Sequence, residues 1–526
     1  MKKIRNLKLF LINGSISCLS LIIIQIIAII FNVYISNKIG AQGVGTYAII
    51  LSLLNFSITM SCFGLNLAST KVISSYLAIN ENKKAIKSFK LCLILSFLAS
   101  ILAIIIIFIF SDIIQKIILK NTISKKVIYY IMLSLPFISL SACINGFFNS
   151  IRKVYKNVIL TIIEQFFKIL FTFLFIINKV SIESTICSLM LANLLSVVIS
   201  FVVGFSFYLY DKRKIINNLD FTGFDYKFNL KEKTKNKNKN LLTINFTYLK
   251  EIFQIAVPIG TTSIIRAALS TIKHMMIPLR LQKTGIGYAH AMSLYGIINA
   301  MVMPIILFPS VVINSFATLL IPEFTRLHKL NYKKRIKFLT NRIFKIVFSF
   351  SFFVLTTFLT FYNFIANTFY PSEALVPSYI IYLCPLISIM YIDTVADCIL
   401  KGLNKQVDVM KINILDLVTS TILIFFLIPI LGVKAYILIL YISEFLNGIL
   451  SIYLIIKYTK IKFNIYEYII VPLALCIVSR TIYLKLVSAT LNTNLIFGIF
   501  LFSFITLAIF LIFQILSKIS QKKSGI

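Results

Sequence analysis

Four polar residues share one helical face within an apolar segment near the middle of the 526-residue chain. Ser270, Lys273 and His274 follow Arg266 at intervals of four, seven and eight positions, and helical periodicity places side chains with this spacing together. The apolar segment, residues 252–277, contains no acidic residue. This cationic, hydroxylated stripe predicts a binding site for an anionic group such as phosphate. The alternative is that these residues pair with acids on neighbouring helices, while Lys273 extends its ammonium group toward water.

Carboxylates in the C-terminal half form a second group of candidates. Asp393 and Asp397 lie four positions apart, with Lys401 one turn further, and Asp416 and Glu444 are single acids of the next two apolar segments. Two neighbouring carboxylates resist simultaneous ionisation, so these acids could bind a proton or Na⁺ and couple its movement to transport. The alternative is that they pair with basic groups near the ends of their helices.

Other apolar segments contribute one charged pair and several amides. Glu164 and Lys168 are four positions apart, and this spacing predicts a structural ion pair on one helix. Amide side chains are candidates to line a cavity, although small polar groups also simply pack helices together. They are Gln25, Asn32, Asn55 and Asn299.

Motifs for catalysis or for a bound cofactor are missing from the sequence. No segment has the form GxxxxGK[ST] of a phosphate-binding loop. The three histidines, His274, His290 and His328, do not have the spacing of metal ligands. We therefore expect no metal, no cofactor and no enzymatic activity, and transport would draw on H⁺, Na⁺ or the membrane potential.

The composition indicates which elements position these residues. The chain is 59% hydrophobic and 13% charged, with a mean hydropathy of +0.93, whereas soluble domains are about 45–50% apolar and about 25% charged. The net charge of +36 comes from basic groups that stand between apolar runs. Contact with anionic lipid headgroups explains that arrangement better than binding of nucleic acid.

Fourteen apolar segments are each long enough to span a bilayer as a helix. They are residues 10–36, 44–67, 91–110, 127–148, 158–176, 185–208, 252–277, 291–318, 343–365, 379–400, 412–430, 435–455, 469–486 and 495–516. With both termini in the cytoplasm, most Lys and Arg residues fall in cytoplasmic segments, as topology rules expect. The external segment 111–126, with four lysines, is the one exception. The sequence thus predicts an all-α, multi-pass protein of the cell membrane.

A polar stretch divides these segments into two groups. Residues 211–250 form a basic cytoplasmic linker, which separates a six-helix lobe, residues 1–210, from a second six-helix lobe, residues 251–460. Because six is even, both lobes begin on the cytoplasmic side, as in a parallel repeat. Residues 461–526 hold two appended helices and a cytoplasmic tail. Weak similarity between residues 148–153 and 400–405 agrees with a repeat, although chance similarity between biased sequences is the alternative.

Several short motifs resemble one family when taken in order. They are KIGAQGVGTY at 38–47, FGLNLA at 63–68, IEQ at 163–165, IPLRL at 277–281, LYG at 294–296, LLIPEF at 319–324 and KGLNK at 401–405. Together they resemble the multidrug/oligosaccharidyl-lipid/polysaccharide flippase superfamily, and within it the stage V sporulation protein B group, which is related to lipid II flippases. The resemblance implies two lobes around a central cavity that opens alternately to each side, and a lipid-tail groove beside the last two helices. It also implies cavity arginines in the first and seventh spans. Arg266 matches the arginine of the seventh span, but the first span has no arginine after Arg5.

We therefore expect a flippase for an undecaprenyl-phosphate-linked saccharide, either a peptidoglycan precursor or another envelope or spore-cortex glycan. The diphosphate would lie near Arg266 and Lys273, and the sugars near Gln25, Asn32 and Asn299. Membrane lipids, the lipid-linked saccharide and cell-wall or polysaccharide synthases are the expected partners of a monomeric protein that binds no nucleic acid.

Two other functions fit the sequence less well. A cation-coupled multidrug exporter would need an acidic cavity, whereas the seventh span is cationic. A membrane glycan polymerase or ligase would need a large external loop rich in carboxylates. The external acids are only Asp112, Glu183 and Glu373.

Overall fold

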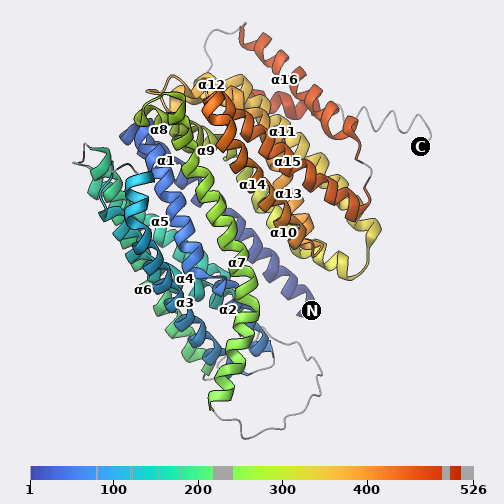
Figure 1. Cartoon of the computed structure of the whole chain (residues 1–526). Coiled ribbons are helices and arrows are strands. Elements are labelled where there is room, and N and C mark those ends of the chain that lie inside the picture. The colour runs from blue at the N-terminus through green and yellow to red at the C-terminus, as the bar shows by residue number, and fades with distance from the viewer. Residues whose placement is uncertain are drawn as a thin grey trace. The chain divides into compact units, whose positions relative to one another are not determined.

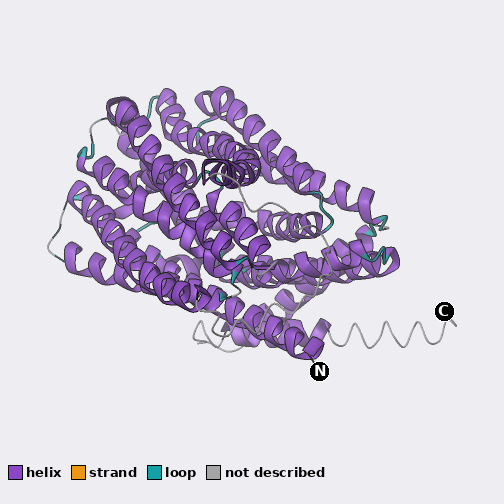
Figure 2. Cartoon of the chain, turned by 90° about the horizontal axis from the view of Figure 1, so that it is seen from below, coloured by secondary structure: helices purple, strands orange, loops and turns teal. Residues whose placement is uncertain are grey.

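A computed structural model describes residues 2–78, 81–118, 120, 122–151, 153–177, 179, 181–216, 241–461, 463–488 and 498–510 of the chain. These residues form helices and short connections, and none of them belongs to a strand (Figure 2). The predicted all-α membrane fold is confirmed, since twelve of the described helices are long and apolar enough to cross a membrane.

The N-terminal helices are long, and most have no break. They are α1 (Lys2–Cys62), α2 (Leu65–Ala78), α3 (Asn82–Ile113), α4 (Lys126–Ser150), α5 (Val154–Ile176), α6 (Ile182–Ile216) and α7 (Leu241–Leu281), with a π-helical turn, η1 (Ile114–Ile118), after α3 (Figure 1). In α1, Gly40 has φ 68° and ψ 175°, which breaks the helix between the predicted segments 10–36 and 44–67. The candidate span at Ile23–Leu77 has 55 residues. At 1.5 Å per residue it would be about 80 Å long if straight, so it holds more than one crossing of a hydrocarbon core about 30 Å thick.

The C-terminal helices are more often interrupted. They are α8 (Tyr288–Gly296), α9 (Met303–Leu307), α10 (Ser310–Lys329), α11 (Lys333–Phe369), α12 (Val376–Leu383), α13 (Ile387–Gly402), α14 (Gln406–Leu431), α15 (Val433–Thr459) and α16 (Val471–Ser488). Short 3₁₀ and π elements join some of them, namely η2 (Gln282–Thr284), η3 (Ile297–Val302), η4 (Cys384–Leu386) and η5 (Tyr466–Ile470).

The predicted eighth segment, 291–318, is not one continuous helix. It passes through α8, η3 and α9, which ends at Leu307, and continues in α10, which begins at Ser310. Pro309 explains the break between α9 and α10, because a proline ring clashes with the carbonyl four residues earlier in a helix and has no N–H to donate. Of the predicted last segment, 495–516, only the helix Gly498–Phe510 lies within the described residues. The total of fourteen crossings stays a prediction.

The chain forms two compact units. One holds residues 1–20 and 46–275, and the other holds residues 21–45 and 276–526. These bounds fall within helices, whereas residues 217–240 of the predicted linker lie outside the described part of the chain. The predicted lobe boundaries at 210, 250 and 460 stay predictions.

The core of the first unit is aromatic. Phe89 of α3, Phe147 of α4 and Tyr208 of α6 are buried, and their ring centroids are 4.7–5.1 Å apart. Ring pairs at this separation stabilise packing beyond the burial of their area. This cluster therefore fixes α3, α4 and α6 against one another.

A buried carboxylate ties α5 to α6 in the same unit. Asp211 is fully buried, and its two oxygens accept hydrogen bonds from Lys153 and Lys156, each at 2.8 Å. The Lys156 ammonium group also lies 5.0–5.7 Å from the ring centroids of Phe148, Phe207 and Tyr210. The negative charge is thus fully compensated, and one lysine is enclosed by aromatic rings.

One interhelical contact occurs in both units. The Thr70 hydroxyl of α2 donates to the Gly146 carbonyl of α4 at 3.1 Å, and the Thr325 hydroxyl of α10 donates to the Gly402 carbonyl of α13 at 3.0 Å. Each threonine also lies within hydrogen-bond distance of the carbonyl four residues earlier in its own helix. A Cβ added at Gly402 would lie 2.7 Å from the Phe324 Cβ, so only glycine allows this approach. An internal repeat would produce such a recurring contact, and the parallel orientation of the predicted repeat stays a prediction.

Candidate transport site

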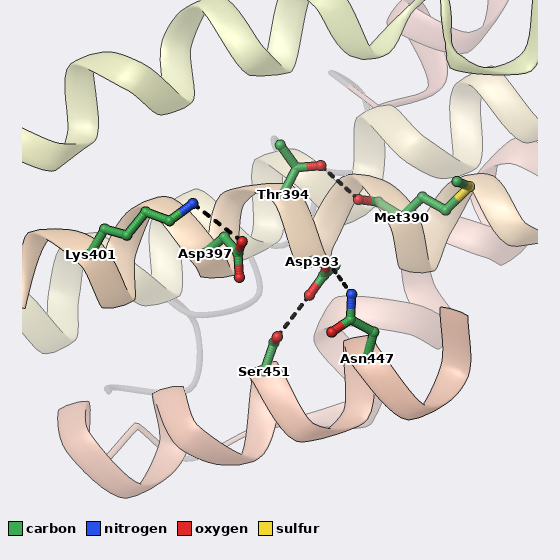
Figure 3. Close-up of polar contacts among 7 residues, drawn as sticks. All are labelled: Met390, Asp393, Thr394, Asp397, Lys401, Asn447 and Ser451. Carbon is green, nitrogen blue, oxygen red and sulfur yellow. Dashed lines mark hydrogen bonds and ion pairs between the residues drawn. The ribbon is translucent and has the colours of Figure 1, made fainter. Parts of the chain in front are cut away.

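Asp393 lies at the centre of a polar cluster in the second unit (Figure 3). Its carboxylate accepts hydrogen bonds from the Ser451 hydroxyl at 2.7 Å and from the Asn447 amide at 3.1 Å. Asp393 belongs to α13, and both donors belong to α15. A Cβ added at Gly448 would come to 2.5 Å from a methyl carbon of Ile389, so this glycine lets α15 approach α13 closely enough for the bonds to form.

The neighbouring acids have different partners. Asp397 forms a salt bridge of 3.3 Å with Lys401 on its own helix, as the alternative interpretation of the sequence expected. Asp416 of α14 accepts a hydrogen bond from the Ser443 hydroxyl of α15. Glu444 of α15 is half-buried and makes further interactions.

The three donors on α15 went unnoticed in the sequence. Ser443, Asn447 and Ser451 are spaced four residues apart, so they form one stripe of neutral polar residues along α15. The same spacing argument that selected Arg266 and its neighbours would have selected them. The acids on α13 and α14 therefore face a helix that supplies neutral donors.

Asp393 differs from Asp397 because no salt bridge between described residues includes it. Its hydrogen-bond donors carry no charge. The side-chain carbonyl oxygen of Asn447, in contrast, is buried and has no hydrogen-bond partner. The amide presents its nitrogen to the carboxylate, and a half-turn about its last bond would present the oxygen instead. A carboxylate with an amide oxygen is a set of ligands that suits a hard cation, and the carboxyl group could alternatively carry a proton.

The predicted cationic face belongs to α7 in the first unit. Arg266 is exposed, whereas Ser270, Lys273 and His274 are half-buried, and the last two make further interactions. Thr271, next to Ser270, donates from its hydroxyl to the Ser52 carbonyl of α1 at 3.1 Å and so attaches α7 to α1.

Arg266 lies at the centre of its candidate span. It is 18 residues from Tyr248 and 18 from Thr284, the two ends of that span. No salt bridge or hydrogen bond joins its guanidinium to any residue that the structure describes. The pairing with neighbouring acids that the alternative interpretation expects does not form for Arg266 in the described part of the chain.

Two of the four amides predicted to line a cavity meet at the π-helical element η3. The Asn32 amide of α1 donates to the Ala300 carbonyl at 2.9 Å, and the Asn299 amide donates to the hydroxyl of buried Tyr295 at 3.0 Å. A π-helical turn inside a span displaces side chains from the α-helical register and often marks a functional region. Gln25 and Asn55 are exposed on α1, and no described residue bonds to either side chain.

The remaining candidates are less informative. Glu164 and Lys168 are both half-buried on α5, and their pairing stays a prediction. Among the described residues, no group of three or more His, Cys, Asp or Glu side chains has the arrangement of a metal site.

Comparisons with known proteins agree with this architecture. The sequence pattern of the family described as "Polysaccharide biosynthesis protein" matches residues 10–328. No functionally curated protein matches the chain by sequence.

Solved structures share the fold at low sequence identity. The lipid II flippase MurJ in an inward closed conformation is 14% identical, with a TM-score of 0.64 over 98% of this chain and 100% of that one. An inward-facing multidrug resistance MATE family transporter of the MOP superfamily is 13% identical, with a TM-score of 0.59 over 83% of this chain and 94% of that one. A MOP superfamily transporter from Pyrococcus furiosus is 13% identical, with a TM-score of 0.56 over 85% and 96%.

Proposed function

Because this chain belongs to the polysaccharide biosynthesis protein family, we propose that it is a flippase for an undecaprenyl-phosphate-linked saccharide. It carries the headgroup across the cell membrane by alternating access, while the lipid tail stays in the bilayer. Retaining the tail in lipid is essential, because each buried CH₂ group contributes about 0.8 kcal/mol. Only the polar head then has to cross.

The observation that carries this proposal is the state of Arg266. A charged side chain at the bilayer centre costs about 2.5–3.5 kcal/mol or more unless it meets a partner or water. The fully buried charge of Asp211 is compensated by two lysines, whereas Arg266 has no partner among the described residues. An anionic cargo supplies the missing partner. A membrane potential that is negative inside assists export of such a headgroup by about 2.3 kcal/mol per charge per 100 mV.

The experiment is reconstitution in liposomes with labelled lipid-linked precursors, scoring which of them crosses. Arg266→Ala should abolish transport, and Arg266→Lys should retain part of it, because the positive charge remains. Lys250→Ala, an exposed lysine near the beginning of the same helix, is the matched control and should transport normally. Full transport by Arg266→Ala at normal protein level would exclude the proposed headgroup contact.

We also propose that Asp393 couples transport to a cation, either H⁺ or Na⁺. Its carboxylate has only neutral donors, and a half-turn of the Asn447 amide would present the unpartnered oxygen to complete a cation site. Asp393→Asn should make transport insensitive to an imposed Na⁺ or proton gradient, while Asp397→Asn, which removes the acid paired with Lys401, should leave that dependence intact. An unchanged gradient dependence in Asp393→Asn would mean that the membrane potential alone drives the step.

The same carboxylate favours a second candidate function, cation-coupled export of organic cations. A lipophilic cationic dye, loaded into the same liposomes, separates the two functions. A flippase leaves the dye gradient unchanged, whereas an exporter moves the dye and is indifferent to Arg266→Ala. The proposal includes coupling to a polysaccharide synthase, which crosslinking in cells tests. It also includes a cytoplasmic location for both termini, which accessibility of terminal tags tests.

A further inference from the structure

We propose that a hollow at the beginnings of α4 and α6 binds the phosphate of a headgroup. It lies in the first unit, at the end of α6 opposite to Asp211, and it shares no residue with either site described above. Its volume is about 370 Å³, within the range of about 300–1,000 Å³ typical of small-molecule sites. The proposal does not depend on the flippase function, since any phosphate-bearing ligand at the membrane surface could occupy the hollow.

The charged groups of this hollow are not neutralised by one another. Lys126 and Lys179 line it together with one acid, Glu183. Both lysines are exposed, and no salt bridge between described residues includes any of the three. Adjacent Lys125, in contrast, is bound to Asp112 at 2.6 Å. The hollow therefore keeps a positive charge that a phosphate can neutralise.

Side chains, and not the helix end, supply the recognition groups. The first turn of α6 is already capped, because the Ser184 N–H donates to the Ser181 hydroxyl at 3.2 Å. Tyr130 lines the hollow, and its hydroxyl has no partner among the described residues. Two lysines and a tyrosine in the wall of one hollow provide donors that match the acceptor oxygens of a phosphate.

The position of the hollow selects a ligand at headgroup depth. One candidate span begins at Lys126, and another begins at Ile182, three residues after Lys179. Tyr129, which is 49% exposed, precedes Tyr130, and exposed tyrosines at the end of a span are typical of the membrane surface. The four lysines of residues 111–126 are also the one departure from the predicted charge asymmetry. A ligand for Lys126 explains part of this basic excess on the side where topology rules disfavour it.

A cysteine in the wall allows a direct test on the full-length protein. Cys187 lines the hollow and is a free, half-buried thiol. In a variant that keeps only this cysteine, we expect a bound phosphate to slow its reaction with a hydrophilic maleimide. The free fraction falls as 1/(1 + [L]/Kd), so the rate should drop about tenfold at ten times the Kd.

The arms of the experiment distinguish the sources of phosphate. Nanodiscs of phosphatidylcholine, whose phosphate is offset by choline, give the reference rate. Nanodiscs that also contain phosphatidylglycerol or undecaprenyl diphosphate supply a lipid-borne phosphate, and inorganic phosphate in the buffer supplies a free one. Slowing in any of these three arms supports a phosphate site and identifies its source. A second reporter, Ser124→Cys in a background without Cys187, probes another wall of the same hollow.

Charge variants decide whether Lys126 and Lys179 hold the phosphate that protects the cysteine. K126Q/K179Q should remove the protection, K126R/K179R should keep it, and K125Q should keep it because Lys125 lies outside the hollow. Unchanged rates at both reporters in all phosphate arms would overturn the proposal. Protection that survives in K126Q/K179Q would overturn it as well.

Discussion

Asp211→Asn should destabilise the first unit strongly, because it leaves Lys156 charged and without its carboxylate. The Lys156 side chain is only 9% exposed, whereas Lys153 is 27% exposed and can reach water. Breaking a buried ion pair by removing one partner costs about 3–5 kcal/mol. The three aromatic rings around the Lys156 ammonium group offset part of this cost, by up to about 2 kcal/mol. The net loss should be about 2–4 kcal/mol.

Thermal unfolding in detergent, followed with a thiol-reactive dye, measures this loss. Cys92 and Cys143 lie in the core of the same unit with 0% exposure, so they react only when the unit opens. A loss of 3 kcal/mol corresponds to about 6–12 °C for a unit of this size. The double variant Asp211→Asn/Lys156→Met should recover most of the difference, because a methionine fills the aromatic pocket without a charge. Asp112→Asn, which breaks an exposed pair, should cause no measurable change.

A small effect of Asp211→Asn would refute this reasoning. An unfolding temperature within about 2 °C of the parent, which is below 1 kcal/mol at this size, would mean that water reaches Lys156 despite its burial. Failure of the second substitution to restore stability would mean that Asp211 acts through another contact.

Two further predictions concern the second unit. Gly402→Ala should cost about 1–3 kcal/mol, because the new Cβ meets Phe324, whereas Gly287→Ala, with no atom within 4 Å, should be neutral in the same unfolding assay. Burial raises the pKa of Tyr370 to about 12, from an ordinary value of about 10. Its neutral form is favoured in the fold, so its contribution to stability is complete below pH ~10 and is lost as the pH rises through ~12. Tyr370→Phe should therefore reduce the fall in unfolding temperature between these pH values, and an identical fall would contradict the assignment.

Residue spacing predicted which helices carry the candidate site better than it predicted which side chains bind to one another. The regular intervals around Arg266, and those between Asp393 and Asp397, selected helices that carry polar faces. The partners of each acid depend on contacts between helices. Asp393 meets neutral donors because Gly448 lets α15 approach α13, and no local pattern encodes that contact. The spacing of Asn447 and Ser451 is visible in the sequence, but their role as donors to Asp393 depends on this contact between helices.

Helix interruptions were the least predictable part of the fold. Pro309 is visible in the sequence, but hydropathy alone joined the residues on both sides of it into one segment. The π-helical element η3 has no comparable signal, because one extra residue per turn leaves composition unchanged. Its effect is nevertheless large, since it determines where Asn299 and the Ala300 carbonyl point.

The threonine–glycine contact present in each unit has a consequence for the history of the chain. If both copies descend from one ancestor, and if each lobe has the predicted six spans, that ancestor was an even-numbered bundle whose two ends stood on the same side of the membrane. Two such bundles insert in the same direction without any change in their charge bias, so a simple tandem fusion of the gene yields a viable protein. In the predicted topology, the lysine-rich connection between the halves then needs to join only two ends that share a compartment.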